Sequence, residues 1–368
     1  MTSVRWLPAS AAASVAPIWQ ALEAHAGGGG LANSWEWTDT WLRHFGSRVP
    51  HRFALGERDG EPCGIVLVSE GVTRRYGPLT VRHLHLGTAG EASGESVCVE
   101  YNRLLVLPEA RVEFAAALLA ALRREPGWDE LTLDLFAPED AEPLLRASPG
   151  MLVRRFPCPA VDLCQVRDSG GDVLSALSAS IRARVRRGLR GFGEVRLEWA
   201  ETAEHALGIL DELIALHQRR WTAAGERGAF ASPSFTAFHR ELIARWIPRG
   251  RVLLFRVRSD QGTIGCLYGL IEEGRVYFYQ GGFAEFDDNR LRPGLVAHAL
   301  CMQACLERGL AEYNFLKGES RYKRELSTVE RELISATLQR PRPKMLVLEG
   351  LRSVRARLRT GGLLPSPS

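Results

Sequence analysis

The stretch from Tyr277 to Lys323 decides the fold. Residues 277–283 read Tyr-Phe-Tyr-Gln-Gly-Gly-Phe, residues 292–294 read Arg-Pro-Gly, and residues 313–323 read Tyr-Asn-Phe-Leu-Lys-Gly-Glu-Ser-Arg-Tyr-Lys. The aromatic run predicts a strand, the Pro-Gly pair opens a helix, and the last segment predicts a second strand ending in a polar cluster. Because a helix N-terminus carries unpaired N–H groups and partial positive charge, this order suits an anion such as a phosphate.

The composition is that of an ordinary globular protein. The chain has 368 residues, of which 45% are hydrophobic and 24% are charged, and this length suits two domains. The formal net charge of +4 does not call for a nucleic-acid partner, and we expect no DNA binding. The seven cysteines are scattered and odd in number, which favours reduced thiols in the cytoplasm over a disulfide framework.

We expect neither a transmembrane segment nor a secretory signal. The sequence has no run of about 18 apolar residues, the length that a membrane-spanning helix needs. The Ala-rich stretch 9–16 is interrupted by serines, is followed by Pro17 and lacks a strongly basic lead, unlike a signal peptide. We therefore expect a cytoplasmic protein.

The chain contains a candidate internal repeat. Residues 53–71 read as a hairpin with an Asp-Gly turn, and residues 255–274 have the same layout with one residue deleted. An amphipathic helix precedes each hairpin, and a helix followed by a strand comes later in both halves, at 114–136 and 295–316. A duplicated α+β unit is the simplest account, although helix-then-strand order is common enough to recur by chance.

This order of elements resembles the acyl-donor half of the GNAT acyltransferase superfamily. Most closely it resembles the BioF2-like branch, which includes proteins associated with cellulose biosynthesis and is related to Fem-type double-GNAT transferases. The resemblance covers most of the chain and implies an α+β fold of tandem GNAT-like domains, each a mostly antiparallel mixed sheet flanked by helices. We expect an N-terminal domain over residues 1–159, a C-terminal acyltransferase domain over 160–340, and a basic helix and tail over 341–368.

Two prolines mark the expected boundary. Pro157 and Pro159 should interrupt any regular element, and the strand Ala160–Val166 should begin or bridge into the second unit. The Arg-Pro-Arg-Pro stretch after about Gln339 should end the fold.

The candidate catalytic residues follow the second strand of the opening stretch. Gly318 allows a sharp exit, and the resemblance places Tyr322 and Lys323 over the splayed strand ends where acyl transfer occurs in this superfamily. Lys323 would stabilise the oxyanion, Tyr322 would donate a proton, and Glu319 would act as base or orient the acceptor. The alternative is a solvated lysine beside a packed tyrosine. The branch often has Asp at the position of Asn314, so a carboxylate role is removed there.

The candidate donor-binding residues are Arg290, Arg292, Gly294 and Tyr279. Gly294 would let the donor approach the backbone, and the two arginines would neutralise its phosphates. The common GNAT phosphate loop, with its second glycine, is absent; the likeness is to a Pro-Gly variant, which puts coenzyme A itself in doubt and leaves a plain helix start as the alternative. Tyr279 lies on the strand whose backbone holds the pantetheine arm in GNAT folds, although strand aromatics are more often packing residues.

Gln280, Trp221 and Arg187 are candidate acceptor-binding residues. Gln280 could hydrogen-bond the acceptor, and Trp221 opens a Gly-rich charged loop that covers a substrate or is a simple connection. Arg187 belongs to the basic helical run 180–190, which is either a solvated face or a clamp for an anionic substrate. No aromatic-rich RNA-binding motif accompanies the run.

No metal site is expected. His298, Cys301 and Cys305 share one helical side, but no second pair of ligands is evident, and cysteines also bury readily as small apolar groups.

Together these features predict an N-acyltransferase. It would move an acyl group from a thioester donor, either acyl-CoA or an acyl carrier protein, to an amine on a small-molecule or cell-envelope acceptor, with no tightly bound cofactor. A Fem-type transferase that uses aminoacyl-tRNA is the alternative enzyme, disfavoured by the low net charge. A catalytically idle double-GNAT binding module for a polysaccharide-synthesis complex is the alternative outside enzymes.

Overall fold

The computed structural model describes residues 2–27, 30–76, 79–98 and 100–348. The expected basic tail lies outside the described residues except for its first eight positions, of which 343–348 are helical. Within the described ranges no helix is long and apolar enough to cross a membrane.

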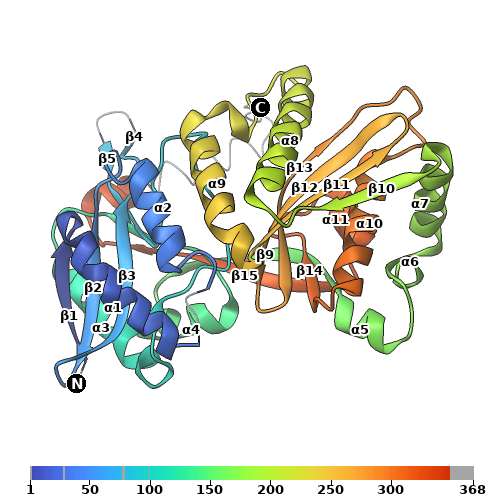
Figure 1. The fold of residues 1–368 in the computed structure, drawn as a ribbon. Coiled ribbons are helices and arrows are strands. Elements are labelled where there is room, and N and C mark those ends of the chain that lie inside the picture. The colour runs from blue at the N-terminus through green and yellow to red at the C-terminus, as the bar shows by residue number, and fades with distance from the viewer. Residues whose placement is uncertain (1, 28–29, 77–78, 99, 349–368) are drawn as a thin grey trace.

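The first half of the chain contains the elements β1 to α4 (Figure 1). Their bounds are β1 Thr2–Pro8, α1 Ala12–His25, α2 Trp35–Phe45, β2 His51–Arg58, β3 Glu61–Glu70, β4 Arg74–Tyr76, β5 Leu79–Val81, β6 His83–Leu86, β7 Leu105–Val106, α3 Arg111–Arg124, β8 Glu130–Phe136 and α4 Pro138–Ala147.

The second half follows a strand that both halves share. The bounds are β9 Leu152–Asp162, α5 Leu163–Asp168, α6 Val173–Ala176, α7 Ala179–Phe192, β10 Val195–Trp199, α8 Ala203–Ala223, α9 Pro233–Trp246, β11 Val252–Ser259, β12 Gly262–Glu272, β13 Arg275–Phe283, α10 Pro293–Glu307, β14 Glu312–Asn314, α11 Arg321–Leu326 and β15 Val329–Gln339, which ends where the Arg-Pro-Arg-Pro stretch begins.

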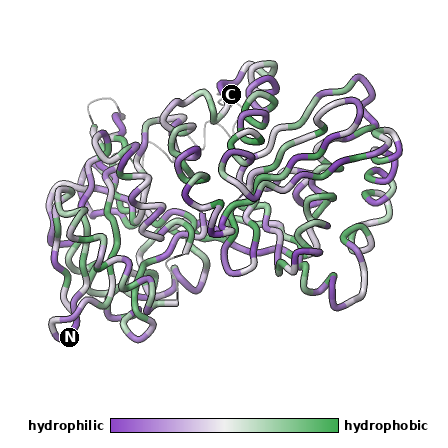
Figure 2. The backbone as a smooth tube through the Cα atoms, viewed as in Figure 1, coloured by the Kyte–Doolittle hydropathy of each residue, from purple (hydrophilic) through white to green (hydrophobic). Residues whose placement is uncertain are grey.

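One mostly antiparallel sheet runs through both halves. Its order is β1-β2-β3-β6-β8-β15-β9-β14-β13-β12-β11-β10, with β7 on β3, and the parallel pairs are β6–β8 and β13–β14. Helices flank the sheet, and hydrophobic residues run along its strands in both halves (Figure 2). This is the expected α+β architecture of two GNAT-like sheets.

The two halves repeat each other in detail. In the first hairpin Gly56 pairs with Gly64 immediately before a shift of register, and in the second Val257 pairs with Gly265 immediately before the same kind of shift. Each hairpin is followed by a parallel strand pair bridged by a helix, α3 in one half and α10 in the other. The shared bulge position supports a duplicated unit, because a chance recurrence of helix and strand would not reproduce it.

The halves exchange strands at the centre of the sheet. The strand β9 pairs with β14 of the second half, whereas β15, from the end of the chain, reaches back to pair with β8 of the first. The two exchanged strands also pair with each other along Leu152–Ala160. The expected boundary at 159/160 thus falls inside β9.

Two expectations about this junction were wrong. Pro157 and Pro159 lie inside β9. Their carbonyls accept hydrogen bonds from the segment 315–318, on the side of the strand away from β15. The N–H groups that proline lacks would point to that same side, so the pairing with β15 loses no hydrogen bond. The strand also ends at Asp162 rather than Val166, because the Asp162 side chain accepts a hydrogen bond from the Gln165 N–H and caps α5.

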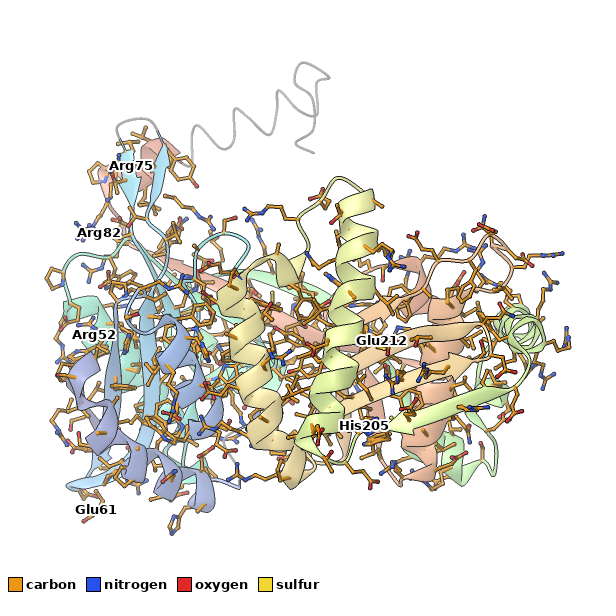
Figure 3. All side chains as sticks on the ribbon, turned by 45° about the horizontal axis from the view of Figure 1, so that its top comes forward. Arg52, Glu61, Arg75, Arg82, His205 and Glu212 are labelled. Carbon is orange, nitrogen blue, oxygen red and sulfur yellow. The ribbon has the colours of Figure 1, made fainter. Side chains whose placement is uncertain are left out.

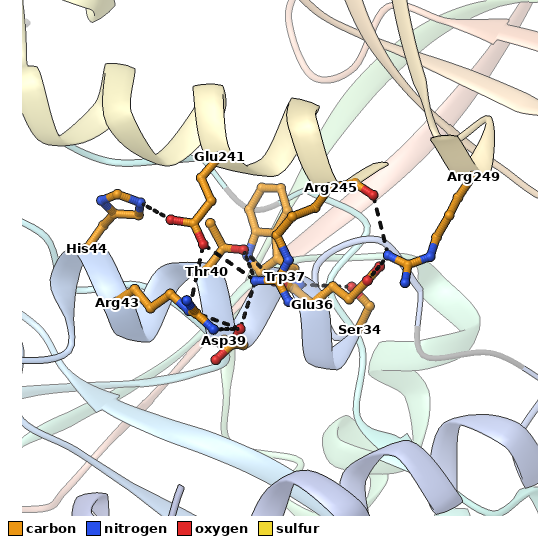
Figure 4. Close-up of polar contacts among 10 residues, drawn as sticks. All are labelled: Ser34, Glu36, Trp37, Asp39, Thr40, Arg43, His44, Glu241, Arg245 and Arg249. Carbon is orange, nitrogen blue, oxygen red and sulfur yellow. Dashed lines mark hydrogen bonds and ion pairs between the residues drawn. The ribbon is translucent and has the colours of Figure 1, made fainter. Parts of the chain in front are cut away.

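A shared core joins the halves beside the exchanged strands. Trp37 of α2 packs against Phe238 and Trp246 of α9, with ring centroids 5.0 and 6.1 Å apart. Polar contacts border this core (Figure 4): Arg245 of α9 donates to Asp39 at 2.7 Å and to Thr40 at 2.9 Å, and Glu241 pairs with His44. The relative placement of the halves is therefore fixed by packing as well as by the sheet.

Charged side chains of both signs cover both halves (Figure 3), in keeping with the small net charge. Many are paired locally. His205 and Glu212 on α8, labelled in Figure 3, bond to Glu198 of β10 and Arg256 of β11.

Candidate active site

The centre of the site is an opening between β13 and β14. These strands pair only from Arg275 to Tyr277, after which β13 continues to Phe283 while β14 ends at Asn314. A β-bulge in β13 lies where the two strands diverge. Tyr268 of β12 pairs with Gln280 and the next residue, Gly269, pairs with Phe278, so Tyr279 is the extra residue. Within the described residues, the edge of β13 beyond Tyr277 therefore has no strand partner.

The helix α10 begins at the open end of β13. Arg292 precedes it in the left-handed region, with φ 48°, and Pro293 occupies the first turn. A Cβ on Gly294 would lie 3.5 Å from the Phe283 ring, an ordinary contact, so internal packing does not require glycine here. Glycines on α7 let that helix approach this turn, since a Cβ on Gly188 or Gly191 would collide with Leu291.

The two arginines at this helix start differ. Arg290 is bonded to Asp288, which it contacts at 2.9 Å, and the pair lowers the pKa of Asp288 to about 2. Arg292 is exposed, as is Arg187 one helix away, whose charge also lowers the pKa of Asp288. Arg187 of α7 thus lies near the start of α10, and of the two arginines at that start only Arg290 has a carboxylate partner among the described residues.

Lys323 lies on α11 beside the end of the opening. Its ammonium donates to the Lys317 carbonyl at 2.8 Å and to the Leu316 carbonyl at 3.4 Å. Gly318 has φ 140°, and a Cβ there would lie 3.1 Å from the Lys323 Nζ, so the glycine provides both the turn and the space for the amine. Burial lowers the pKa of Lys323, partly offset by Glu100.

Glu100 is a functional candidate that the sequence reasoning missed. It lies on a loop of the first half, and its carboxylate accepts a hydrogen bond from the Lys317 N–H at 2.7 Å. Burial raises the pKa of this carboxyl group, while Lys323 and Lys317 lower it. No local pattern marks Glu100, since its partners lie more than two hundred positions later in the chain.

Two more residues of this loop, Val97 and Tyr101, contact residues at the opening. The Asn314 amide donates to the Tyr101 hydroxyl at 2.7 Å, and the rings of Tyr101 and Tyr277 lie 4.8 Å apart. The Tyr279 hydroxyl donates to the Val97 carbonyl. Tyr279 is therefore a partly buried packing residue of this junction, and its hydroxyl is already bonded to the Val97 carbonyl.

Tyr322 covers an aromatic cluster at the opening. Its ring stacks on His298 at 5.4 Å with an interplanar angle of 23°, and it meets Phe315 edge-on at 6.1 Å. It keeps 37% of its surface exposed, and burial of the rest raises the pKa of its hydroxyl. A tyrosine in this position can reach solvent or a bound ligand.

The remaining predicted residues are spread more widely. Glu319 is exposed just before α11, Gln280 lies on β13 opposite Tyr268, and Trp221 is 42% exposed near the end of α8, 5.8 Å from the His217 ring. The structure brings Lys323 and Tyr322 to the same short helix with Glu100 beside Lys323. It does not place Trp221 or Arg187 in contact with them.

The corresponding opening in the first half is filled. Here β6 and β8 separate after His85–Thr132, and Asn102 lies between them. The side-chain amide of Asn102 donates to the Leu86 carbonyl at 2.7 Å, and the backbone N–H of Asn102 donates to the Leu135 carbonyl at 3.1 Å. A donor arm could not enter there without expelling this segment.

Two surface cavities lie elsewhere. One of about 390 Å³ is bordered by Glu23, Arg251 and Glu272, and one of about 230 Å³ by Glu70, Gly71 and Glu91. Neither includes Lys323 or Tyr322. No group of three or more potential metal ligands gathers within the described ranges.

Comparisons with known proteins agree with the fold. Residues 175–324, which contain the β13–β14 opening and the first four residues of α11, match the family model of the acetyltransferase (GNAT) domain. Among solved structures, FemX is similar over 87% of this chain and 95% of that chain, at 12% identity and a TM-score of 0.55. L-PGS from Bacillus licheniformis is similar over 90% of this chain and 96% of that chain, at 14% identity and a TM-score of 0.51. No curated protein matches the sequence.

Residues 175–324 match a GNAT domain, and the chain as a whole has a fold similar to those of FemX and L-PGS. The GNAT-like fold predicted from the sequence is confirmed. The narrower BioF2-like assignment stays a prediction.

Proposed function

We propose that this protein is an N-acyltransferase that takes its acyl group from a thioester of the pantetheine type and works at the β13–β14 opening. The observation that carries the proposal is the contrast between the halves: in the part of the chain that the structure describes, the second opening has no strand partner for β13 beyond Tyr277, and the first is filled by Asn102. Lys323, Tyr322 and Glu100 lie at the free opening.

In this proposal the donor's phosphates lie at the start of α10, near Arg292, where helix N–H groups and guanidinium favour anions. The arm follows the unpaired edge of β13. Its thioester then reaches the segment 316–323, where the Lys323 ammonium stabilises the oxyanion.

The acceptor is a primary amine that enters from the junction of the halves. Its nitrogen attacks the thioester carbonyl carbon, a C–N bond forms, and the C–S bond breaks. Glu100 takes the proton that the amine loses, and Tyr322 protonates the departing thiolate. A buried carboxyl with a raised pKa is a stronger base than an exposed one, which suits Glu100 to this step.

A panel experiment tests the proposal. The purified protein is incubated with acyl-CoA or acyl carrier protein donors and pools of primary amines, and mass spectrometry follows donor consumption and product mass. We expect loss of thioester together with an acylated amine, in wild type and not in Lys323→Ala. If aminoacyl-tRNA is consumed while every thioester is ignored, the donor assignment is wrong.

The tRNA-dependent alternative has one structural observation in its favour. Arg186, Arg187 and Arg190 are exposed on α7 near the start of α10 and have no side-chain partner in the part of the chain described. A polyanionic donor would gain from them. A non-catalytic binding module is favoured only if no donor is consumed although ligands bind.

A further inference from the structure

Two buried histidines share an unusual arrangement. His298 and His239 each hydrogen-bond a tyrosine hydroxyl through Nδ1 at 3.1 Å, Tyr313 in one case and Tyr268 in the other. In both rings the Nε2 atom is buried and has no partner within the described residues. An unpaired buried polar atom lowers the stability of the fold by on the order of 1–3 kcal/mol. Each of these two Nε2 atoms therefore needs a physical explanation.

His298 lies on α10, and its ring packs against β13 and β14 beside their opening. Its ring contacts Phe278 from β13 at 4.6 Å, Phe315 just after β14 at 5.3 Å, and Tyr322 from α11 at 5.4 Å. It is 1% exposed, and the stacked Tyr322 ring, which is 37% exposed, forms its outer cover. Its Nδ1 is held by Tyr313 of β14, so Nε2 is the ring atom left for something else.

His239 occupies a different place. It lies on α9 among Phe235, Phe238, Tyr268 and Tyr279, at centroid distances between 4.3 and 5.5 Å. These residues form part of the core that joins the halves. Since the two histidines match in partner type, burial and orphaned atom, His239 is an internal control for His298.

We propose that the Nε2 atom of His298 hydrogen-bonds an amide group of the donor's pantetheine arm, and that Tyr322 is the movable cover that the arm displaces. This inference rests on the proposed thioester donor. Burial lowers the pKa of His298 to about 3, with the Lys323 charge acting in the same direction, so the ring is neutral. A neutral imidazole carries one N–H and one bare nitrogen, and an amide offers a complement to either.

The site has the character that such an arm needs. Aromatic rings from three elements exclude water, and one neutral polar atom fixes the position of a neutral polar chain. The cover is small, because α11 has only six residues and movement of the Tyr322 ring alone uncovers the histidine. His298 would be a positioning residue, because it would bind the pantetheine arm and not the reacting carbon.

Histidine-selective ¹⁵N NMR and calorimetry test the inference, with coenzyme A and phosphopantetheine as probes. We expect either probe to shift the Nε2 resonance of His298 and to leave that of His239 unchanged. His298→Phe keeps the aromatic packing and removes the hydrogen bond, so coenzyme A should bind about 2- to 12-fold more weakly. His239→Phe should bind it as wild type does.

Melting curves separate a structural role from this one. Replacing either histidine with Phe removes an unpaired Nε2 atom but leaves a buried tyrosine hydroxyl without its partner, so both variants should shift the melting temperature alike, whereas only His298→Phe should weaken binding. Wild-type affinity in a folded His298→Phe protein, together with an unshifted His298 Nε2 resonance when the wild type binds coenzyme A, would overturn the inference and leave the thioester donor standing. If wild type binds neither probe, the proposed thioester donor fails and this inference fails with it.

Discussion

Lys323 is the residue whose position says most about the chemistry. Its amine is held by two backbone carbonyls of the turn that ends the second strand, over a glycine that leaves room for it. We predict that Lys323→Ala lowers kcat by about 10²–10³, the usual cost of losing one oxyanion donor, with the melting temperature and donor affinity retained. Lys317→Ala is the matched control, because that amine lies over the Phe156 ring instead. Near-normal kcat in a folded Lys323→Ala protein would remove Lys323 from the mechanism.

Glu100 makes a prediction about pH. As the base it must be ionised, so the rate should rise as pH increases through its pKa, which burial has raised above the ordinary value of 4.5. Glu100→Gln keeps an acceptor for the Lys317 N–H and should lower kcat/KM while removing this acid limb from the pH profile. An unchanged acid limb in the variant would assign that titration to another group.

The two arginines at the start of α10 should contribute unequally to donor binding. Arg290 already pairs with Asp288 and must leave it to reach a phosphate, whereas Arg292 is exposed. We predict that Arg292→Ala weakens coenzyme A binding roughly tenfold, within the range of a charge-assisted hydrogen bond, and that Arg290→Ala has less effect. Calorimetry measures the affinity of each variant for coenzyme A. Affinities equal to that of wild type in both variants would exclude this phosphate site.

At the scale of elements, the loop 97–103 connects the closed opening of the first half with the free one of the second. Asn102 is 1% exposed and satisfies the Leu86 carbonyl. We predict that Asn102→Ala destabilises the fold by about 1–3 kcal/mol and lowers kcat, because the same loop carries Glu100. Urea unfolding and kinetics measure both effects. Ser93→Ala, at an exposed position before the loop, is the control, and a loss of stability without any loss of kcat would separate the loop from the site.

The elements also show where sequence reasoning succeeds. The hairpins, α3, α10 and the strands beside them were predicted because their hydrophobic period and turn residues are local signals. The exchange of β9 and β15 was not, since pairing between strands so far apart leaves no local pattern, and the two prolines pointed to an interruption. Tyr322 and Lys323 could be proposed from the sequence because they follow Gly318, whereas Glu100 and His298 become candidates only through partners that the fold brings close.

At the scale of the whole molecule, the buried histidines make stability depend on pH. Burial lowers the pKa of both His239 and His298 from the ordinary 6.5 to about 3. The unfolded chain therefore binds protons below pH 6.5 that the native state does not, and stability present at neutral pH is lost as pH falls toward 3. We predict a loss approaching about 1.4 kcal/mol per pH unit for each histidine.

Urea unfolding between about pH 7 and about pH 5 measures this linkage. The double variant His239→Phe and His298→Phe should lose stability more slowly over that range than wild type does. A pH dependence equal to that of wild type would show that other groups cause it.

The central claim is that the donor binds in the second half, between β13 and β14. A crystal structure of the protein with coenzyme A tests it most directly. The account predicts the phosphates at the start of α10 beside Arg292 and the arm along β13, with its sulfur directed toward Lys323. Coenzyme A bound instead at the start of α3 in the first half, with Asn102 expelled from between β6 and β8, would contradict it.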